Sequence, residues 1–207
     1  MIRTVKVRLH PTKEQEIKMW QSAGTMRWAY NYTLSKEEEN NKNGGKFISN
    51  DEIRKEITQL KKTSEYAWLN EVSAQIPKQA VKDACNAYKK FFNKESEKPR
   101  YKSRKRSKPS FYNDNVKLKF NGKEFLIEKV GWMEISEPQR ITENKFYNPR
   151  ISHDGKYWYI SIGMEIKEER KKEELSGESV GIDLGIKKLA VCSNDQEFRN
   201  INKTSTV

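Results

Sequence analysis

Cysteine and histidine are scarce in this 207-residue chain, and their scarcity excludes a common class of metal site. The two cysteines, Cys85 and Cys192, are far apart and form no Cys-x-x-Cys pair, and the histidines, His10 and His153, are isolated. Because structural zinc needs four such ligands at close spacing, we expect no zinc. A bridge between the cysteines is the less favoured alternative to free thiols, and we expect a cytoplasmic location.

Long apolar runs are also absent. No stretch approaches the roughly 20 residues that a membrane-spanning helix needs. Residues 1–9 alternate charged and apolar side chains, unlike a signal peptide. We therefore expect no membrane partner. The chain does contain 5 Trp, 9 Tyr and 8 Phe, which are enough for small folded cores.

Positive charge is the main surplus: 41 Lys and Arg against 29 Asp and Glu give a net charge of +12. Such a balance favours a polyanionic partner. The densest cluster, residues 98–108, contains no acid. A solvated linker is the alternative, but linkers usually mix charge signs, whereas cations with an interleaved tyrosine suit phosphate binding and base stacking. The candidates are Arg100, Tyr101, Lys102, Arg104, Lys105, Arg106 and Lys108, next to Lys98.

Periodicity predicts a strand and three helices before this cluster. Residues 4–9 alternate as a half-buried strand. Thr12-x-x-Gln15 and Ser49-x-x-Glu52 have capping-box spacing and predict helix starts, and a third helix is expected from about 73 to 92. Aromatic residues at helical spacing are expected in the core; they are Trp20, Trp28, Tyr30, Trp68, Tyr88, Phe91 and Phe92.

After the basic cluster the period changes to two. Residues 116–127 predict a hairpin with a type I′ turn at Asn121-Gly122, and residues 146–166 predict a second hairpin. Tyr157 and Tyr159 are expected on the face opposite Trp158. Both hairpins are placed to pair with the first strand and close a small barrel. Residues 166–179 read as a charged linker.

Near the end, residues 180–192 predict a short apolar strand with Asp183 at its tip, a glycine turn and an answering strand. A carboxylate among buried apolar residues suits a metal ligand. A turn-capping aspartate and a phosphate loop are the alternatives. Only two carboxylates follow, Asp195 and Glu197, whereas a two-metal site needs several that converge.

The order of these parts resembles the TnpB (OrfB) family, insertion-sequence-encoded RNA-guided DNA endonucleases related to type V CRISPR effectors and also described as transposases. The resemblance spans the chain and is carried by residues 2–9 with Pro11, RWAYN at 27–31, WLNEVS at 68–73, AYKKFF at 87–92, PRYKS at 99–103 with Ser110-Phe111, and GIDLG at 181–185.

The resemblance implies an α+β fold in three domains. An oligonucleotide-binding-type β-barrel, the wedge domain (1–10 and 108–178), would be split by a three-to-four-helix recognition lobe (11–107) that carries the basic loop 98–108. The first hairpin of a truncated ribonuclease-H-like (RuvC) nuclease domain (179–207) would follow. The implied partners are guide RNA from the same element and double-stranded target DNA with a short target-adjacent motif.

The resemblance also assigns site residues. Asp183 would be the first Mg²⁺-binding RuvC carboxylate, and the DNA motif would be read near the starts of the second and third helices, by Asn50, Arg54, Gln75, Lys78 and Gln79. An ordinary polar helix face is an equal alternative. Arg3, Lys6 and Arg8 would grip the RNA scaffold or solubilise an edge strand.

The family's later RuvC strands, catalytic Glu and Asp, and zinc-binding four-cysteine insertion have no counterpart in this sequence. We therefore expect nucleic-acid binding without tight Mg²⁺ binding and without cleavage. The competing interpretations are a nuclease-dead RNA-guided DNA-binding repressor, an unguided nucleic-acid-binding module, and an inactive remnant.

Overall fold

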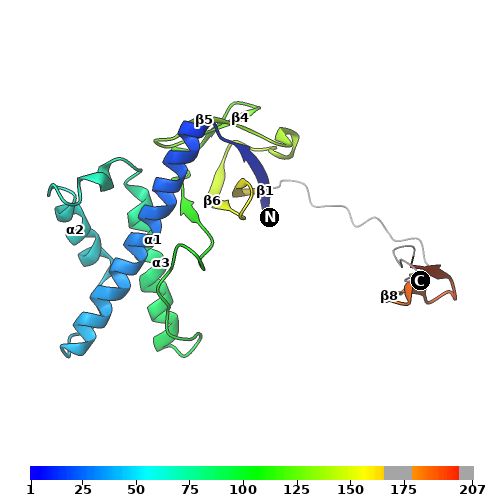
Figure 1. Ribbon diagram of the computed structural model, residues 1–207, viewed down its shortest axis with the longest axis horizontal. Coiled ribbons are helices and arrows are strands. Elements are labelled where there is room, and N and C mark those ends of the chain that lie inside the picture. The colour runs from blue at the N-terminus through cyan, green and yellow to red at the C-terminus, as the bar shows by residue number, and fades with distance from the viewer. Residues whose placement is uncertain (166–178, 201–207) are drawn as a thin grey trace, which may run out of the picture. The chain divides into compact units, whose positions relative to one another are not determined.

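The computed structural model describes residues 1–165 and 179–200 (Figure 1). The chain divides into two compact units, Met1–Lys167 and Glu168–Val207. Within the described residues, the first unit has three α-helices and a seven-stranded antiparallel sheet, and the second has a three-stranded sheet. The predicted linker 166–179 lies outside the described residues except for Ser179. None of the helices described is long and apolar enough to cross a membrane.

Two of the helices begin at the predicted capping boxes. The backbone N–H of Gln15 donates to the Thr12 hydroxyl at the start of α1 (Lys13–Lys42), and the Gln15 side chain accepts from the Thr12 N–H. Ser49 and Glu52 form the same reciprocal pair at the start of α2 (Asn50–Leu60). Each pair satisfies N–H groups that have no partner within the helix. α3 (Gln75–Phe92) confirms the third predicted helix.

The sheet of the first unit has the order β2-β6-β7-β1-β5-β4-β3. β1 pairs with β7 along its length and with β5 at its end. The predicted pairing of the first strand is therefore confirmed for the hairpin of residues 146–166 and wrong for that of residues 116–127, because β5, a strand that was not predicted, lies between β1 and β4. The strands are β1 (Ile2–His10), β2 (Ser110–Tyr112), β3 (Lys119–Phe120), β4 (Glu124–Ile127), β5 (Gly131–Ile135), β6 (Phe146–His153) and β7 (Trp158–Glu165), with short 3₁₀ helices at Ala67–Asn70 (η1) and Pro138–Arg140 (η2).

The sheet curves strongly. Phe125 on β4 and Phe146 on β6 meet edge to face with centroids 5.4 Å apart, although three strands separate them in the sheet order. The inner face is the core, where Val5, Val7 and Leu9 of β1 are buried. In the described residues no ladder joins β2 to β3, so backbone pairing leaves the curved sheet open between its two edge strands.

The predicted type I′ turn at Asn121-Gly122 is wrong, and the strand before it is shorter than predicted. A type I′ turn needs positive φ at both central residues, but only Gly122 has it, at 99°. The Asn121 side-chain oxygen instead accepts the backbone N–H groups of Lys123 and Glu124, at 3.0 and 2.8 Å. The Asn121 side chain therefore holds this turn together with a backbone hydrogen bond from the Asn121 N–H to the Glu124 oxygen at 3.2 Å.

The helices pack beside the sheet. α1 and α3 run side by side, and the first turns of α1 reach the sheet (Figure 1). Gln15 at the start of α1 donates to the backbone oxygen of Trp132 on β5 at 2.6 Å. This contact anchors one end of α1 on the sheet while its other end extends among the helices.

The expectation that the helical aromatics lie in the core is confirmed for Tyr30 and Tyr88, which are buried, and wrong for three others. Trp20, Trp68 and Phe92 are 42%, 37% and 58% exposed. Trp20 follows Met19, which belongs to the buried stripe of α1, so its ring turns toward the edge of the sheet. Trp158 is buried while Tyr157 and Tyr159 are not, as predicted.

The second unit has strands β8 (Ile182–Leu184), β9 (Lys188–Cys192) and β10 (Glu197–Arg199), in the order β10-β9-β8. The predicted strand and answering strand are present, and β10 is an addition. The expected burial is wrong: Ile182 and Leu184 are 62% and 74% exposed within this unit. Three short strands offer too little surface to cover their own apolar residues.

Candidate nucleic-acid interface

The basic loop, residues 98–108, follows α3 and is tied to α1 by specific hydrogen bonds. The Asn31 side-chain amide donates to the Lys102 backbone oxygen and accepts from the Lys102 N–H, both at 2.8 Å. About two turns further along α1, Glu38 binds the Lys98 amino group and the Tyr101 hydroxyl, each at 2.9 Å. These contacts lower the pKa of Glu38. The loop therefore has a defined path along α1.

Lys102 points inward. Its amino group lies 4.0 Å from the centroid of the buried Tyr30 ring, and burial lowers its pKa while Asp83 opposes the change. Asp83 on α3 binds Arg150 on β6 through two contacts, at 2.8 and 3.1 Å, and accepts a hydrogen bond from Gln79 at 2.8 Å. We call these five residues the Asp83–Arg150 cluster. It joins the loop, both long helices and the sheet.

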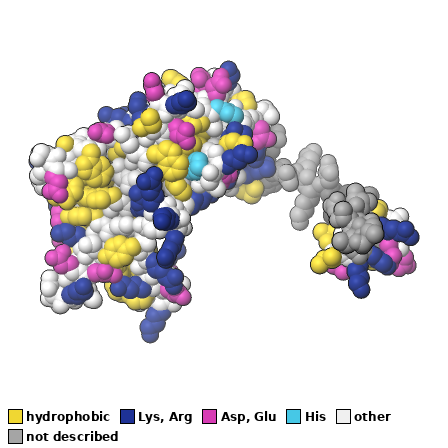
Figure 2. Space-filling view, viewed as in Figure 1, with side chains coloured by type: hydrophobic (Ala, Val, Ile, Leu, Met, Phe, Trp, Pro, Cys, Tyr) yellow, Lys and Arg dark blue, Asp and Glu magenta, His cyan; other side chains and the backbone are white. Residues whose placement is uncertain are grey.

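The tip of the basic loop is a hydrogen-bonded turn. Ser107 N–H donates to the Ser103 backbone oxygen, and the Ser103 hydroxyl accepts the Arg106 N–H, both at 3.0 Å. The Ser107 hydroxyl accepts the Ser103 N–H at 3.0 Å. The turn presents four exposed cations for which the described part of the chain supplies no acidic partner: Arg104, Lys105, Arg106 and Lys108. Figure 2 shows Lys and Arg side chains gathered along the helical part toward the sheet.

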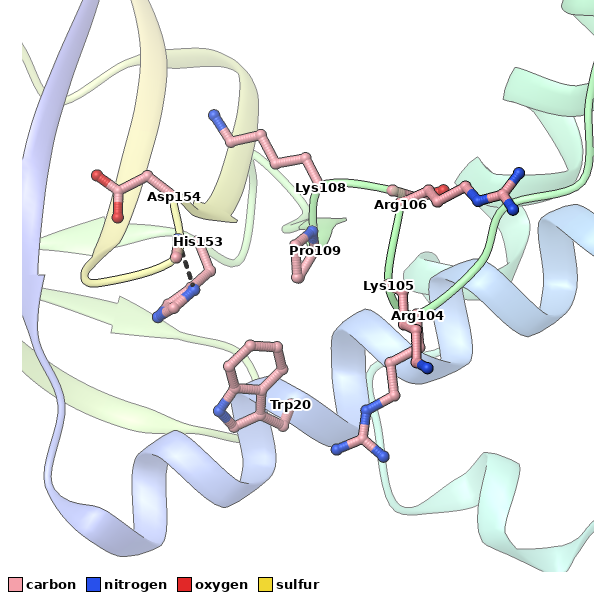
Figure 3. A pocket seen from close by; sticks show the side chains of 10 residues that line it. Trp20, Arg104, Lys105, Arg106, Lys108, Pro109, His153 and Asp154 are labelled. Carbon is pink, nitrogen blue, oxygen red and sulfur yellow. Dashed lines mark hydrogen bonds between the residues drawn. The ribbon is translucent and has the colours of Figure 1, made fainter.

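A cavity of about 590 Å³ opens between this turn, Trp20 on α1 and the β6–β7 turn. Arg104 to Lys108 and Pro109 form one wall, and His153, Asp154 and Gly155 form another (Figure 3). The two walls are linked, because the His153 N–H donates to the Pro109 oxygen at 3.0 Å. The Gly155 N–H donates to His153 Nδ1 at 3.1 Å, which orients the imidazole.

Next to this cavity, the outer face of the sheet carries cations of β1 that lie over tyrosine rings at the start of β7 and just before it. The Lys6 amino group lies 4.1 Å from the Tyr159 ring centroid, and the Arg8 guanidinium lies 3.4 Å from that of Tyr157. Asp154 accepts the N–H groups of Tyr157 and then Lys156, which lower its pKa to about 2. Arg3 is exposed at the start of the same strand. The aromatic rings orient these cations.

The candidates on α2 and α3 divide into two groups. Arg54 and Lys78 line a second cavity, of about 220 Å³, together with Lys61. Lys61 was not predicted; burial and then Lys78 lower its pKa. Arg54 also pairs with Asp51 at 3.2 Å. Gln79 is directed to the Asp83–Arg150 cluster instead, and Gln75 is half-buried. The side-chain oxygen of Asn50 is buried and has no hydrogen-bond partner among the described residues.

Asp183 lies in the second unit, on β8 opposite Val191 of β9, and is exposed. Asp195 lies in a turn, and Glu197 pairs with Lys188. Across residues 1–165 and 179–200, no three Asp, Glu, His or Cys side chains are grouped to hold a metal ion. Both cysteines are free thiols. A two-metal site requires converging carboxylates, and the described residues do not fit that requirement.

Comparison with known proteins supports the family resemblance. The profile of the OrfB/IS605-type helix-turn-helix domain matches residues 1–46, which form β1 and one long helix in this structure. "Putative RNA-guided DNA endonuclease InsQ" of Escherichia coli strain K12 is 31% identical over 97% of this chain and 50% of its own length. "Putative RNA-guided DNA endonuclease" of Streptomyces pristinaespiralis is 29% identical over 96% and 50%.

These matches confirm the resemblance of the chain to the TnpB (OrfB) family, over the N-terminal half of that family's proteins. It spans about half the length of these curated relatives. A cryo-EM structure of a Cas12f1–sgRNA–target DNA complex has a TM-score of 0.41 and 13% identity, over 93% of this chain and 54% of that chain. Likeness at that level carries no argument about fold or partner.

Proposed function

We propose that this chain is the nucleic-acid-binding part of a transposon-encoded RNA-guided DNA endonuclease. It binds guide RNA from its own element and a short motif in double-stranded target DNA. The relatives' names supply the reaction class, and the basic surface of the first unit supplies the binding chemistry. The net charge of +12 favours binding to both RNA and DNA and does not discriminate between them.

One observation carries this proposal: four exposed cations on a hydrogen-bonded turn lack acidic partners in the described part of the chain. Unpaired cations on a surface repel one another, so such a cluster is stabilised when an anion binds. The turn is held by serine hydrogen bonds and by Asn31, so little conformational entropy is lost when phosphates bind. Phosphate contacts of this kind supply affinity rather than sequence choice.

The proposal assigns a role to each part of the chain. The curved sheet is taken as the oligonucleotide-binding-type barrel (1–10 and 108–178), with Lys6 and Arg8 on its outer face against RNA. Residues 11–107 are the recognition lobe. The cavity lined by Arg54, Lys61 and Lys78 is the candidate contact with the DNA motif, since three cations meet there at the start of α3.

Residues 179–207 are taken as the start of the RuvC domain, and we assign them no cleavage. Asp183 is exposed, and the described residues contain no group of three metal-ligating side chains around it. A single carboxylate holds Mg²⁺ weakly. Binding and motif recognition are therefore the functions that we propose for the described part of the chain.

The test replaces Arg104, Lys105, Arg106 and Lys108 together by Ala and measures binding to labelled RNA across a salt series. Each lost phosphate contact on a single strand lowers the log–log salt slope by roughly 0.7, so four contacts should lower it by about 3. The matched control replaces four exposed lysines elsewhere, Lys55, Lys62, Lys82 and Lys117, and removes the same charge.

A slope that falls in the loop variant but not in the control supports the proposal. Equal slopes in wild type and loop variant would remove the basic loop from the interface. Competition with bulk RNA at matched salt then separates recognition of one transcript from unguided binding, because electrostatic attraction alone does not discriminate between RNA sequences.

A further inference from the structure

Trp20 is the unusual member of the cavity beside the basic loop. The residue is 42% exposed, although its ring packs against His153 with centroids 4.9 Å apart and against Trp158 at 5.0 Å. The indole N–H donates to Glu16 Oε1 at 3.4 Å. The ring is therefore held from behind and from one edge while its remaining surface is open to the cavity (Figure 3).

The surroundings of this ring are cationic rather than apolar. Arg104, Lys105, Arg106 and Lys108 line the same cavity. Among the described residues that line the cavity, Asp154 is the acid, and it already accepts two backbone N–H groups. Glu16 lies at the edge of the ring, where it accepts the indole N–H, and does not line the cavity. A protein contact that buried Trp20 would also have to bury these cations away from water, which is unfavourable without a matching set of anions. A flat apolar ring beside unpaired cations suits a ligand that has a π-face and a phosphate.

We propose that this cavity binds one unpaired nucleotide, with its base stacked on Trp20 and its phosphates on the cations of the turn. The inference rests on the proposed nucleic-acid binding and adds a base-contacting residue to it. The volume of about 590 Å³ lies within the range of small-ligand sites. Stacking on an aromatic ring does not depend on which base is bound. The ring and the cations can bind a nucleotide of RNA or of DNA, because both have a base and a phosphate.

The experiment uses the full chain and four labelled ten-nucleotide strands: oligouridine, oligothymidine, and each of these with abasic residues at all ten positions. Trp20→Leu removes the π-face and keeps an apolar side chain, whereas Trp20→Phe keeps a π-face. Trp132→Leu is the matched control, because Trp132 is also 42% exposed and does not line the cavity. Thermal unfolding of each variant verifies that it is folded.

Trp20→Leu should weaken binding of a base-bearing strand about five-fold or more, the lower end for one stacked base. Its binding of the abasic strand should stay unchanged. Trp20→Phe should recover most of the loss, and Trp132→Leu should resemble wild type. A loss confined to oligouridine or to oligothymidine supports the site and identifies its strand.

Equal losses on base-bearing and abasic strands would overturn the proposal, because Trp20 would then act only through the shape of the cavity. No loss on either strand would overturn it as well. If wild type binds abasic and base-bearing strands equally and with a steep salt slope, the nucleic-acid interface stands and this site fails. If wild type binds none of the four strands, both proposals fail.

Discussion

Asp83 on α3 and Arg150 on β6 form a two-point ion pair, with contacts of 2.8 and 3.1 Å, that fastens the helices to the sheet. The two side chains are 22% and 30% exposed, so water screens the pair only in part. Gln79 and Lys102 lie around it, from α3 and the basic loop. The position of the basic loop relative to the sheet therefore depends on this pair.

Replacing Asp83 by Asn should destabilise the first unit by roughly 2 kcal/mol, the usual worth of hydrogen bonds to charged groups. The change leaves Arg150 without its carboxylate and Lys102 without its nearest opposing charge. Urea unfolding measures the effect. The control, Asp51→Asn, removes an exposed pair with Arg54 and should change stability by less than about 1 kcal/mol. Equal effects for the two variants would contradict this account.

Asn31→Ala should release the basic loop, because the Asn31 amide makes both hydrogen bonds to the Lys102 backbone. We expect trypsin to cut within residues 102–108 several-fold faster, since this segment is rich in Lys and Arg. We also expect weaker RNA binding with an unchanged salt slope, because the charges remain and only their order is lost. Asn86→Ala, at an exposed position on α3, is the control and should be cut at the wild-type rate.

Glu37 should make stability depend on pH. It is 5% exposed, one carboxylate oxygen has no partner in the described residues, and the other accepts only the Ile48 N–H at 3.3 Å. Burial therefore raises its pKa above the ordinary 4.5. The folded chain holds this proton more tightly than the unfolded chain, so the associated stability is present below pH 4.5 and is lost as pH rises through the raised value.

Glu37→Gln, which stays neutral, should be more stable than wild type at pH 7, and the difference should shrink toward pH 4. Unfolding free energies measured across this range test the sign. Glu65→Gln removes the same charge from an exposed side chain and should follow the wild-type curve. A gap between Glu37→Gln and wild type that widens toward acid would reverse our interpretation of this carboxylate.

Asp183→Ala should leave RNA binding unchanged, because Asp183 is in the second unit and the proposed interface is in the first. The measurement is the Kd for labelled RNA with and without Mg²⁺. Cleavage that depends on Mg²⁺ and disappears in this variant would show that metal ligands outside the described residues complete the site.

Local signals in the sequence were sufficient for much of the fold. Capping boxes at Thr12 and Ser49 and the alternation of Val5, Val7 and Leu9 each depend on residues within one or two turns. The turn at Asn121 was predicted wrongly because two chemistries, positive backbone φ and an Asn side-chain hydrogen bond, share the same Asn-Gly sequence.

Trp20 was predicted in the core from its helical spacing, but it is partly exposed. Met19, Ala23, Met26 and Tyr30 are buried at helical spacing, and Trp20 lies one position off that stripe. A stricter count would have placed its ring at the margin of the core. Its contact with His153, 133 positions away, has no local signal in the sequence.

The sequence by itself determined the three α-helices of the described residues, the pairing of the first strand with the 146–166 hairpin, the basic cluster and the family resemblance, because these follow from local periodicity, composition and motif order. Only the tertiary structure decided that Lys102 turns inward while its neighbours in the cluster face solvent, and that Trp20 joins them around one cavity. The physical reason is that a side chain's environment is set by residues distant in sequence: Tyr30 and Asp83 surround Lys102, and the β6–β7 turn meets α1.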